Sequence, residues 1–257
     1  MSRLPMPALF LGHGSPMNAL EHTPISQSWR ELGQTLPKPR AILMISAHWN
    51  TRGTLVTAAP KPETIHDFGG FPDTLYAMQY PAPGAPELAA QIATLLPNCS
   101  LDKTRGLDHG AWSLLVHLYP EADVPILQLS LDMQLKPEQE YGTGRALRTL
   151  REQGVLIIGS GNTVHNLRAL VAGDGAYPWA SAFNGAIGQK LLDKADDAVL
   201  NYTNLVDGDT ARLCHPTDEH LRPLFYVLGT GYPDEPRALF NNQLTMGAIS
   251  MLSLKLG

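Results

Sequence analysis

Three histidines of this sequence follow short apolar runs that have the composition of buried strands. His13 comes directly after ALFLG, His48 comes directly after AILMISA, and His165 follows the turn after VLIIGSG. In an open α/β sheet, ligands bind beyond the carboxyl ends of the strands. If these three strands are neighbours in the sheet, we expect the three imidazole rings to share one crevice.

Two further histidines are candidates for the same site. His109 lies in GLDHGAW, where a loop meets the start of a helix, and His220 lies in PTDEHLRP, which we expect early in a helix. Neutral imidazole is the commonest metal ligand, and imidazoles gathered in one crevice would repel each other if protonated. A divalent cation resolves that conflict, so the pattern predicts a metal site. The alternative for each histidine is a hydrogen bond to nearby backbone, and for His109 capping of the following helix is an equally good explanation.

The remaining four histidines have weaker cases. His117 falls in the middle of an apolar helix and is expected in or beside the core. His22 and His66 lie in polar loops, where surface exposure is the simplest expectation. His215 follows a cysteine, and this adjacency alone indicates no particular chemistry.

Other chemistries are not indicated by the sequence. Ser160 in IIGSGN lacks the glycine two positions earlier that a nucleophile elbow requires. The zinc-protease, P-loop and dinucleotide-binding fingerprints are missing. Cys99 and Cys214 have neither the spacing of paired zinc ligands nor the number needed for a disulfide framework. A formal net charge of −5 without any basic run argues against nucleic acid and anionic membranes as partners.

Apolar runs alternate with segments of helical spacing along the chain. Strands are expected over residues 7–12, 40–49, 53–59, 124–131, 155–161 and 246–254. Helices are expected over residues 24–36, 87–96, from just after His109, and over 136–154, 179–196 and 217–229. Continuous apolar strands separated by helices indicate a largely parallel sheet that is covered on both faces. The strand over 53–59 follows its predecessor too closely for a crossover, which favours some antiparallel pairing.

These elements predict one three-layer α/β/α domain over residues 1–257, built around a mixed, largely parallel sheet. The first apolar stretch is too short for a secretory signal, and no run approaches the length of a membrane-spanning helix. With only two cysteines, the sequence favours a cytoplasmic protein. No heptad pattern or apolar stripe indicates an oligomeric state.

Six segments, in order along nearly the whole chain, resemble the class III extradiol ring-cleavage dioxygenases: LGHGSP, ISAHW, DFGGFP, LDHGAW, GSGNTVHNL and HLRPLF. They are most similar to the small single-chain branch that includes bacterial and plant 4,5-DOPA dioxygenases. The resemblance implies a non-haem Fe(II) near the carboxyl ends of the sheet, with His13, His48 and His220 as ligands. Another branch of the family uses a glutamate as third ligand. Glu219 therefore remains an alternative to His220, which the branch resemblance favours.

The resemblance also implies roles for the other two candidate histidines. His165 matches the acid/base histidine of the family, and in the resting enzyme it is also a candidate fourth metal ligand. His109 matches a second histidine of the pocket, which hydrogen-bonds to oxygen or to a substrate hydroxyl. The implied reaction inserts both atoms of O₂ into a catechol beside its two hydroxyls and gives a muconate semialdehyde, with L-DOPA as the expected substrate.

Two other functions fit the same residues. Zn(II) would occupy this ligand set but has no redox chemistry, so a zinc-dependent hydrolase or amidase is one alternative. A non-catalytic metal-binding module is the other, although the presence of both His165 and His109 argues against it. The amino-acid end of L-DOPA would need charged partners, and the sequence nominates none from the arginines considered, which are Arg3, Arg40, Arg168 and Arg222.

Overall fold

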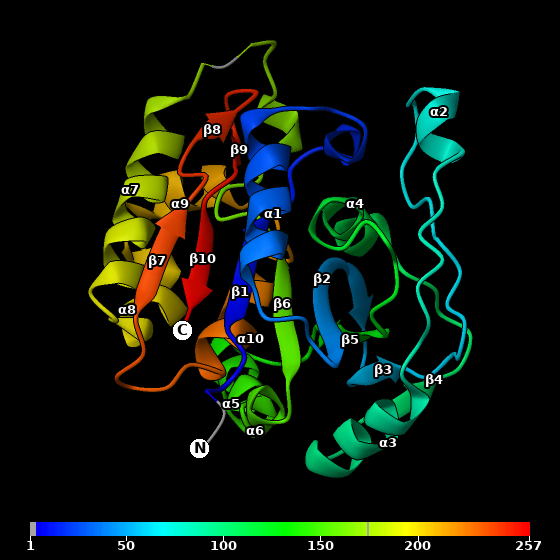
Figure 1. The fold of residues 1–257 in the computed structure, drawn as a ribbon. Helices are drawn as coiled ribbons and strands as arrows, with labels where there is room; N and C mark the ends of the chain where they lie inside the picture. Colours follow the sequence, from blue (N-terminus) through cyan, green and yellow to red (C-terminus); the bar gives the residue numbers. More distant parts are fainter. Residues whose placement is uncertain (1–3, 174) are drawn as a thin grey trace.

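The computed structural model describes residues 4–173 and 175–257 of the chain (Figure 1). Its strands are β1 (Ala8–Gly12), β2 (Ala41–Thr51), β3 (Leu55–Thr57), β4 (Ser100–Asp102), β5 (Ile126–Asp132), β6 (Val155–Gly161), β7 (Arg237–Phe240), β8 (Leu244–Thr245), β9 (Ile249–Ser250) and β10 (Ser253–Leu256). Within the described residues, eight of them form one sheet in the order β4-β3-β5-β2-β6-β1-β10-β7. The strands β8 and β9 pair separately as a short two-stranded sheet.

The centre of the large sheet is parallel. β5, β2, β6 and β1 pair in parallel, whereas β3 runs antiparallel to β5 and β10 runs antiparallel to both β1 and β7. The expected mixed, largely parallel sheet is therefore confirmed. Ser46 of β2 aligns with Ser160 of β6, and Gly12 of β1 aligns with Gly161 of β6. The carboxyl ends of these three neighbouring strands thus lie side by side at the same end of the sheet, which is the upper end in Figure 1.

Helices cover both faces of the sheet. The α-helices are α1 (Pro24–Thr35), α2 (Asp73–Tyr76), α3 (Pro86–Leu95), α4 (His109–Leu118), α5 (Pro137–Leu147), α6 (Thr149–Glu152), α7 (Pro178–Leu192), α8 (Asp196–Leu200), α9 (Gly208–Cys214) and α10 (Arg222–Gly229). Short 3₁₀ turns are η1 (Pro16–Ala19), η2 (Leu167–Ala169) and η3 (Tyr202–Asn204). No helix in the described ranges is both long and apolar enough to cross a membrane.

Alternation of side chains along the central strands divides the core into two layers. On one face, Leu9 and Ile42 belong to a cluster with Trp29 of α1 and Trp112 of α4. The opposite face packs against α3, α5, α7 and α10, and its cluster includes Phe10, Leu43, Leu147, Ile187 and Phe225. This arrangement is the three-layer architecture expected from the sequence.

Several element boundaries differ from the expectations. The segment 136–154 forms two helices, α5 and α6, and the long helix expected over 179–196 ends at Leu192 before α8 starts. Only Leu55–Thr57 of the strand expected over 53–59 is extended in the sheet. The segment 246–254 is divided between β9 and β10, because Met251 donates its amide to Gln243 between the two strands. Short strands at the sheet edges, β4 and β7, were not expected.

The most consequential difference concerns the segment 217–229. It becomes helical only at Arg222, so His220 lies in the turn before α10 rather than inside the helix. Pro223 lies in the first turn of α10, where its missing amide hydrogen has no cost. Further into a helix the proline ring would clash with the carbonyl four residues earlier, which belongs to Glu219.

Candidate metal centre

Three histidines from separate parts of the chain converge beyond the carboxyl ends of the central strands. The ligand atoms that His13, His48 and His220 offer all lie within 4.8 Å of one another. The Nε2 atoms of His13 and His48 are 3.1 Å apart. The ring centroid of His220 lies 5.3 Å from that of His13 and 5.0 Å from that of His48. The structure thus brings together the three rings that the family resemblance implied as metal ligands.

The ring of His13 is oriented by a hydroxyl at the end of the neighbouring strand. Ser160 of β6 donates its hydroxyl to the carbonyl of Gly110 over 2.5 Å, and its Oγ lies 3.0 Å from His13 Nδ1. Because the hydroxyl proton is already used, Ser160 Oγ accepts a hydrogen bond from Nδ1–H of His13. The lone pair of His13 is therefore on Nε2, which faces His48.

His220 reaches the site because the turn that carries it packs directly on the end of β6. The amide of Asn162 donates to the carbonyl of His220 over 2.8 Å. A Cβ atom at Gly161 would lie 2.0 Å from the same carbonyl oxygen, so this position requires glycine. Glu219 Oε1 lies 3.1 Å from His220 Nδ1 and accepts its hydrogen. The buried Nε2 of His220 has no hydrogen-bond partner in the described part of the chain, which suits a metal ligand.

His48 lies within β2 rather than at its end, because the strand continues to Thr51. The pairing of β2 with β5 shifts register between Ile45 and Asn50, and such an irregularity changes the direction of nearby side chains. The carbonyl of His48 accepts a hydrogen bond from Arg105, which also contacts the buried carboxylate of Asp108. These contacts anchor the strand segment that carries the ring.

His165 stacks on His220. The two ring centroids are 3.4 Å apart with an angle of 6° between the ring planes. The amide of His165 donates to the carbonyl of Cys214 over 3.0 Å, which fixes the backbone of this residue. The ligand atoms of His165, Glu219 and His220 also lie within 4.8 Å of one another. The geometry therefore leaves both sequence-based roles of His165 open, as a fourth ligand and as an acid/base group.

His109 is the first residue of α4, and the N-cap position belongs to Asp108. The alternative explanation of His109, capping of this helix, is therefore wrong. Instead, both its backbone amide and its ring Nδ1 contact Asp67 Oδ1, over 2.9 and 3.0 Å. The ring centroid of His109 lies 3.9 Å from that of His48.

Asp67 is the site residue that the sequence-based reasoning did not identify. It belongs to the loop between β3 and α2, which runs up the right side of Figure 1. Its second oxygen, Oδ2, lies 3.7 Å from Nδ1 of His48. The only signal for it was its position in the segment DFGGFP, which resembled the family but carried no assigned role.

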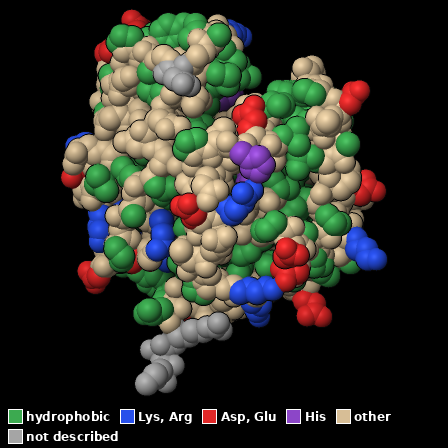
Figure 2. All heavy atoms as spheres, turned by 45° about the horizontal axis from the view of Figure 1, so that its top comes forward, with side chains coloured by type: hydrophobic (Ala, Val, Ile, Leu, Met, Phe, Trp, Pro, Cys, Tyr) green, Lys and Arg blue, Asp and Glu red, His purple; other side chains and the backbone are tan. Residues whose placement is uncertain are grey.

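A cavity of about 440 Å³ adjoins the five histidines. Its walls are largely apolar, with contributions from Phe68, Phe71, Leu167, Leu170, Met246 and Ile249. Figure 2 turns this end of the molecule toward the viewer and shows a histidine side chain near the centre of this face. Of the five imidazoles beside the pocket, those of His13, His109 and His220 are buried and those of His48 and His165 are half-buried. The apolar walls suit a small aromatic molecule.

Burial determines the charge state of the cluster. Burial, reinforced by the neighbouring imidazoles, lowers the pKa of His13 and of His220 well below the usual range. Burial likewise lowers the pKa of His48 and of His165 to about 4. The rings are therefore neutral at pH 7 and present lone pairs, which is the form that binds a metal. Burial of Asp67 acts to raise its pKa, but hydrogen bonds from His109 outweigh this and lower it to about 2.

The other four histidines lie away from this cluster. His117 is buried, as expected, with Nε2 2.7 Å from the carbonyl of Asn18. His22 is exposed, as expected, but His66 is half-buried and its Nε2 contacts the carbonyl of Met78. His215 is buried against the aromatic rings of Phe183 and Tyr202. Neither ring nitrogen of His215 has a hydrogen-bond partner among the described residues.

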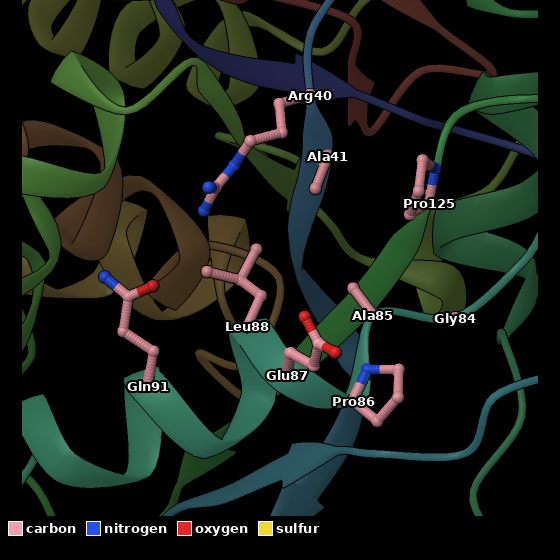
Figure 3. Close-up of a pocket in the computed structure, with 9 residues that line it drawn as sticks. All are labelled: Arg40, Ala41, Gly84, Ala85, Pro86, Glu87, Leu88, Gln91 and Pro125. Carbon is pink, nitrogen blue, oxygen red and sulfur yellow. The ribbon is translucent and has the colours of Figure 1, made fainter.

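None of the arginines considered for substrate binding lines the histidine cavity in the described ranges. Arg40 precedes β2 and lies in a separate pocket with Gln91 of α3 (Figure 3). That pocket is at the amino ends of β2 and β5, opposite the histidines. Arg222 is paired with Glu140 and Asp218, and Arg168 is exposed. Arg3 lies outside the described residues.

Comparison with known proteins assigns the class to which this fold and site belong. Residues 7–252 match the family described as the catalytic LigB subunit of aromatic ring-opening dioxygenase. The chain therefore belongs to this family, and the enzyme class inferred from the sequence, an extradiol dioxygenase, is confirmed.

Individual relatives are similar over the full chain. The chain is 47% identical over 262 residues to the 4,5-DOPA dioxygenase extradiol of Escherichia coli (strain K12), an alignment that covers 100% of this chain and 97% of that protein. It is 40% identical over 256 residues to the 4,5-DOPA dioxygenase extradiol of Beta vulgaris, covering 96% of this chain and 94% of that protein. A crystal structure of an uncharacterized protein from Escherichia coli K12 has a TM-score of 0.85 and 43% identity, and covers 98% of this chain and 100% of that one.

Proposed function

We propose that this protein is a non-haem Fe(II)-dependent extradiol dioxygenase that cleaves a catechol, with L-DOPA as its substrate. The observation that carries the proposal is the convergence of His13, His48 and His220. The Nε2 atoms of His13 and His48 are 3.1 Å apart, and the buried Nε2 of His220 has no hydrogen-bond partner among the described residues. Three neutral imidazoles around one point fit a divalent transition metal. They are compatible with zinc as well as iron, so the identity of the metal is part of the proposal.

His13, His48 and His220 would hold Fe(II), which would supply Lewis acidity toward a catechol hydroxyl and redox chemistry toward O₂. His165 is the general base that accepts the catechol proton, because its ring is neutral at pH 7 and borders the cavity. The same histidine returns the proton as the ring opens. His109, which also lines the cavity, forms a hydrogen bond with a substrate oxygen.

The apolar walls orient the aromatic ring and keep water away from the reacting atoms. Phe68 and Phe71 come from the loop that carries Asp67, and Leu167 and Leu170 come from the segment after His165. These residues contribute apolar walls to one cavity, which suits the aromatic ring of a catechol. Support for L-DOPA comes from the names of the relatives in Escherichia coli and Beta vulgaris.

The test is anaerobic reconstitution with Fe(II), followed by O₂ uptake with a panel that includes L-DOPA, dopamine, 4-methylcatechol and protocatechuate. We expect one O₂ consumed per catechol, a visible-absorbing semialdehyde product, and the highest kcat/KM for L-DOPA. Preference for another catechol would overturn only the substrate assignment. No O₂ uptake with any catechol, together with ester or amide hydrolysis by the zinc-loaded protein without oxygen, would overturn the dioxygenase proposal.

A further inference from the structure

Metal binding and proton transfer by the five histidines do not explain the contacts of Asp67. Its Oδ1 accepts two hydrogen bonds from a single residue, one from the backbone amide of His109 and one from its ring. We propose that Asp67 is a positioning residue that fixes the orientation and tautomer of His109 toward the bound catechol. This inference rests on the proposed function, because it gives His109 a defined task in that reaction.

The tautomer follows from hydrogen-bond chemistry. An ionised carboxylate only accepts hydrogen bonds, so Nδ1 of His109 must carry the hydrogen in the 3.0 Å contact with Asp67. Nε2 of the neutral ring then presents a lone pair. In this tautomer His109 accepts a hydrogen bond from a catechol hydroxyl and cannot donate one through Nε2. The second contact, from the backbone amide, fixes the carboxylate at the start of α4.

The loop around Asp67 is held by contacts that do not involve its carboxylate. The amide of Ile65 donates to the carbonyl of Leu107 over 2.7 Å, and Trp112 Nε1 donates to the carbonyl of Ile65 over 2.9 Å. Nε2 of His66 also contacts the carbonyl of Met78 over 3.0 Å. The loop is thus attached to α4 and to the segment before it independently of the Asp67 carboxylate, and we expect truncation of Asp67 to leave the fold intact.

Direct metal binding by Asp67 is the competing explanation. The ligand atoms of His48, Asp67 and His109 also lie within 4.8 Å of one another. However, Oδ1 of Asp67 and Nδ1 of His109 already bind each other, and the free Nε2 atoms converge elsewhere, between His13, His48 and His220. The geometry therefore favours a positioning role, and metal content separates the two explanations.

The principal test is Asp67→Ala, which removes the oxygen that accepts both hydrogen bonds from His109. Without this acceptor nothing holds the hydrogen on Nδ1, so the ring loses its fixed orientation and populates both tautomers. We expect kcat with a catechol to fall roughly a hundredfold or more, as for loss of a proton-handling group, with little change in KM or metal content. Asp67→Glu, which retains an accepting carboxylate, should recover part of kcat.

A structural readout makes the test independent of turnover. In the metal-free protein, ¹⁵N NMR of the His109 ring should show hydrogen on Nδ1 in the wild type and a mixture of the two tautomers in Asp67→Ala. The matched control is Asp207→Ala, because Asp207 likewise accepts a backbone amide at a helix start, that of Thr210 in α9, but contacts no histidine ring in the described part of the chain. The control should change neither the tautomer of His109 nor kcat.

Three outcomes would overturn the inference. One is loss of bound metal in Asp67→Ala, which would make Asp67 a ligand. Another is a tautomer of His109 that is unchanged in Asp67→Ala. The third is an equal loss of kcat when Asp67→Ala is introduced into His109→Ala, since a residue that acts through His109 has no further effect once that ring is removed. If the wild type cleaves no catechol, the proposed function fails, while the NMR result still decides whether Asp67 sets the tautomer.

Discussion

Ser160 and Glu219 each bind the nitrogen of a histidine that faces away from the cluster. Ser160 accepts from Nδ1 of His13, and Glu219 accepts from Nδ1 of His220. Such partners fix the ring orientation and increase the basicity of the opposite nitrogen. The acidic neighbour considered as an alternative ligand, Glu219, therefore has a geometric reason to support His220 rather than to replace it.

Replacement of Ser160 with alanine should weaken metal binding while the three imidazoles remain. Nδ1–H of His13 loses its acceptor in a buried site, so we expect a 10- to 100-fold loss of metal affinity, which is the usual scale for such a partner. Competition with a chelator of known affinity measures the change.

Ser113 offers a matched control for this substitution. It is a buried serine of α4 whose hydroxyl has no hydrogen-bond partner among the described residues. Ser113→Ala should therefore leave metal affinity unchanged. Equal affinities for Ser160→Ala and the wild type would show that the contact with His13 does not matter for binding.

Replacement of His165 with alanine separates its two candidate roles. If His165 is the acid/base group, the variant should retain its metal and lose turnover roughly a hundredfold or more. Metal analysis and O₂ uptake measure the two quantities on the same sample. The exposed His22 provides the control, since His22→Ala should change neither. Loss of the metal together with turnover would instead make His165 a ligand.

At the scale of elements, the sequence predicts the parts of the site that depend on local pattern. Apolar runs that end near His13 and His48 are readable, because buried parallel strands are continuous and hydrophobic. The neighbouring order of β1, β6 and β2 is then sufficient to bring those rings together. The register shift that turns His48 toward the cavity leaves no comparable trace in the composition of β2.

The positions of His220 and Asp67 depend on contacts between segments that are distant in the sequence. The turn that carries His220 is determined by its packing on Gly161, and the loop that carries Asp67 is determined by contacts with Leu107 and Trp112. Neither contact has a periodic signature, so local pattern alone assigned His220 to a helix and Asp67 to no role. The family resemblance supplied His220, but it supplied no function for Asp67.

Gly161→Ala tests the junction between β6 and the turn before α10. The added methyl group would lie 2.0 Å from the carbonyl oxygen of His220, so the turn must move. We expect a loss of about 1–3 kcal/mol in the free energy of unfolding, as for overpacking, together with weaker metal binding. Urea titration and chelator competition measure the two effects.

Gly185→Ala is the control for this substitution. Gly185 is an exposed glycine in α7, and a Cβ atom there meets nothing within 4 Å. This change should raise stability by about 0.5–1 kcal/mol, because alanine is the better helix former. A Gly161→Ala protein with wild-type stability and metal affinity would contradict the proposed packing constraint.

At the scale of the whole molecule, the buried imidazoles link stability to pH. Burial lowers the pKa of His48, His165 and His215 to about 4 in the folded protein. Between pH 6.5 and 4, the unfolded chain binds protons that the folded chain does not, so the free energy of unfolding falls as the pH falls. At pH 5.5 the loss is about 1.4 kcal/mol for each such imidazole.

Urea unfolding of the metal-free protein at pH 7.5 and 5.5 measures this linkage. A metal bound only to the folded state adds stability at the higher pH and competes with protons at the lower one. His215→Phe should reduce the pH dependence without altering metal binding, because this ring lies outside the converging cluster. Stability that does not change between the two pH values would contradict the depressed imidazole pKa values.

The three converging rings come from widely separated stretches of the chain, and His220 is translated well after His13 and His48. The cluster closes only when the turn before α10 has packed on Gly161, which requires β6 to be in place between β1 and β2. A nascent polypeptide on the ribosome therefore has two of the three imidazoles long before it gains the third. A metal held by all three rings would therefore be acquired only after most of the protein has been synthesised and folded.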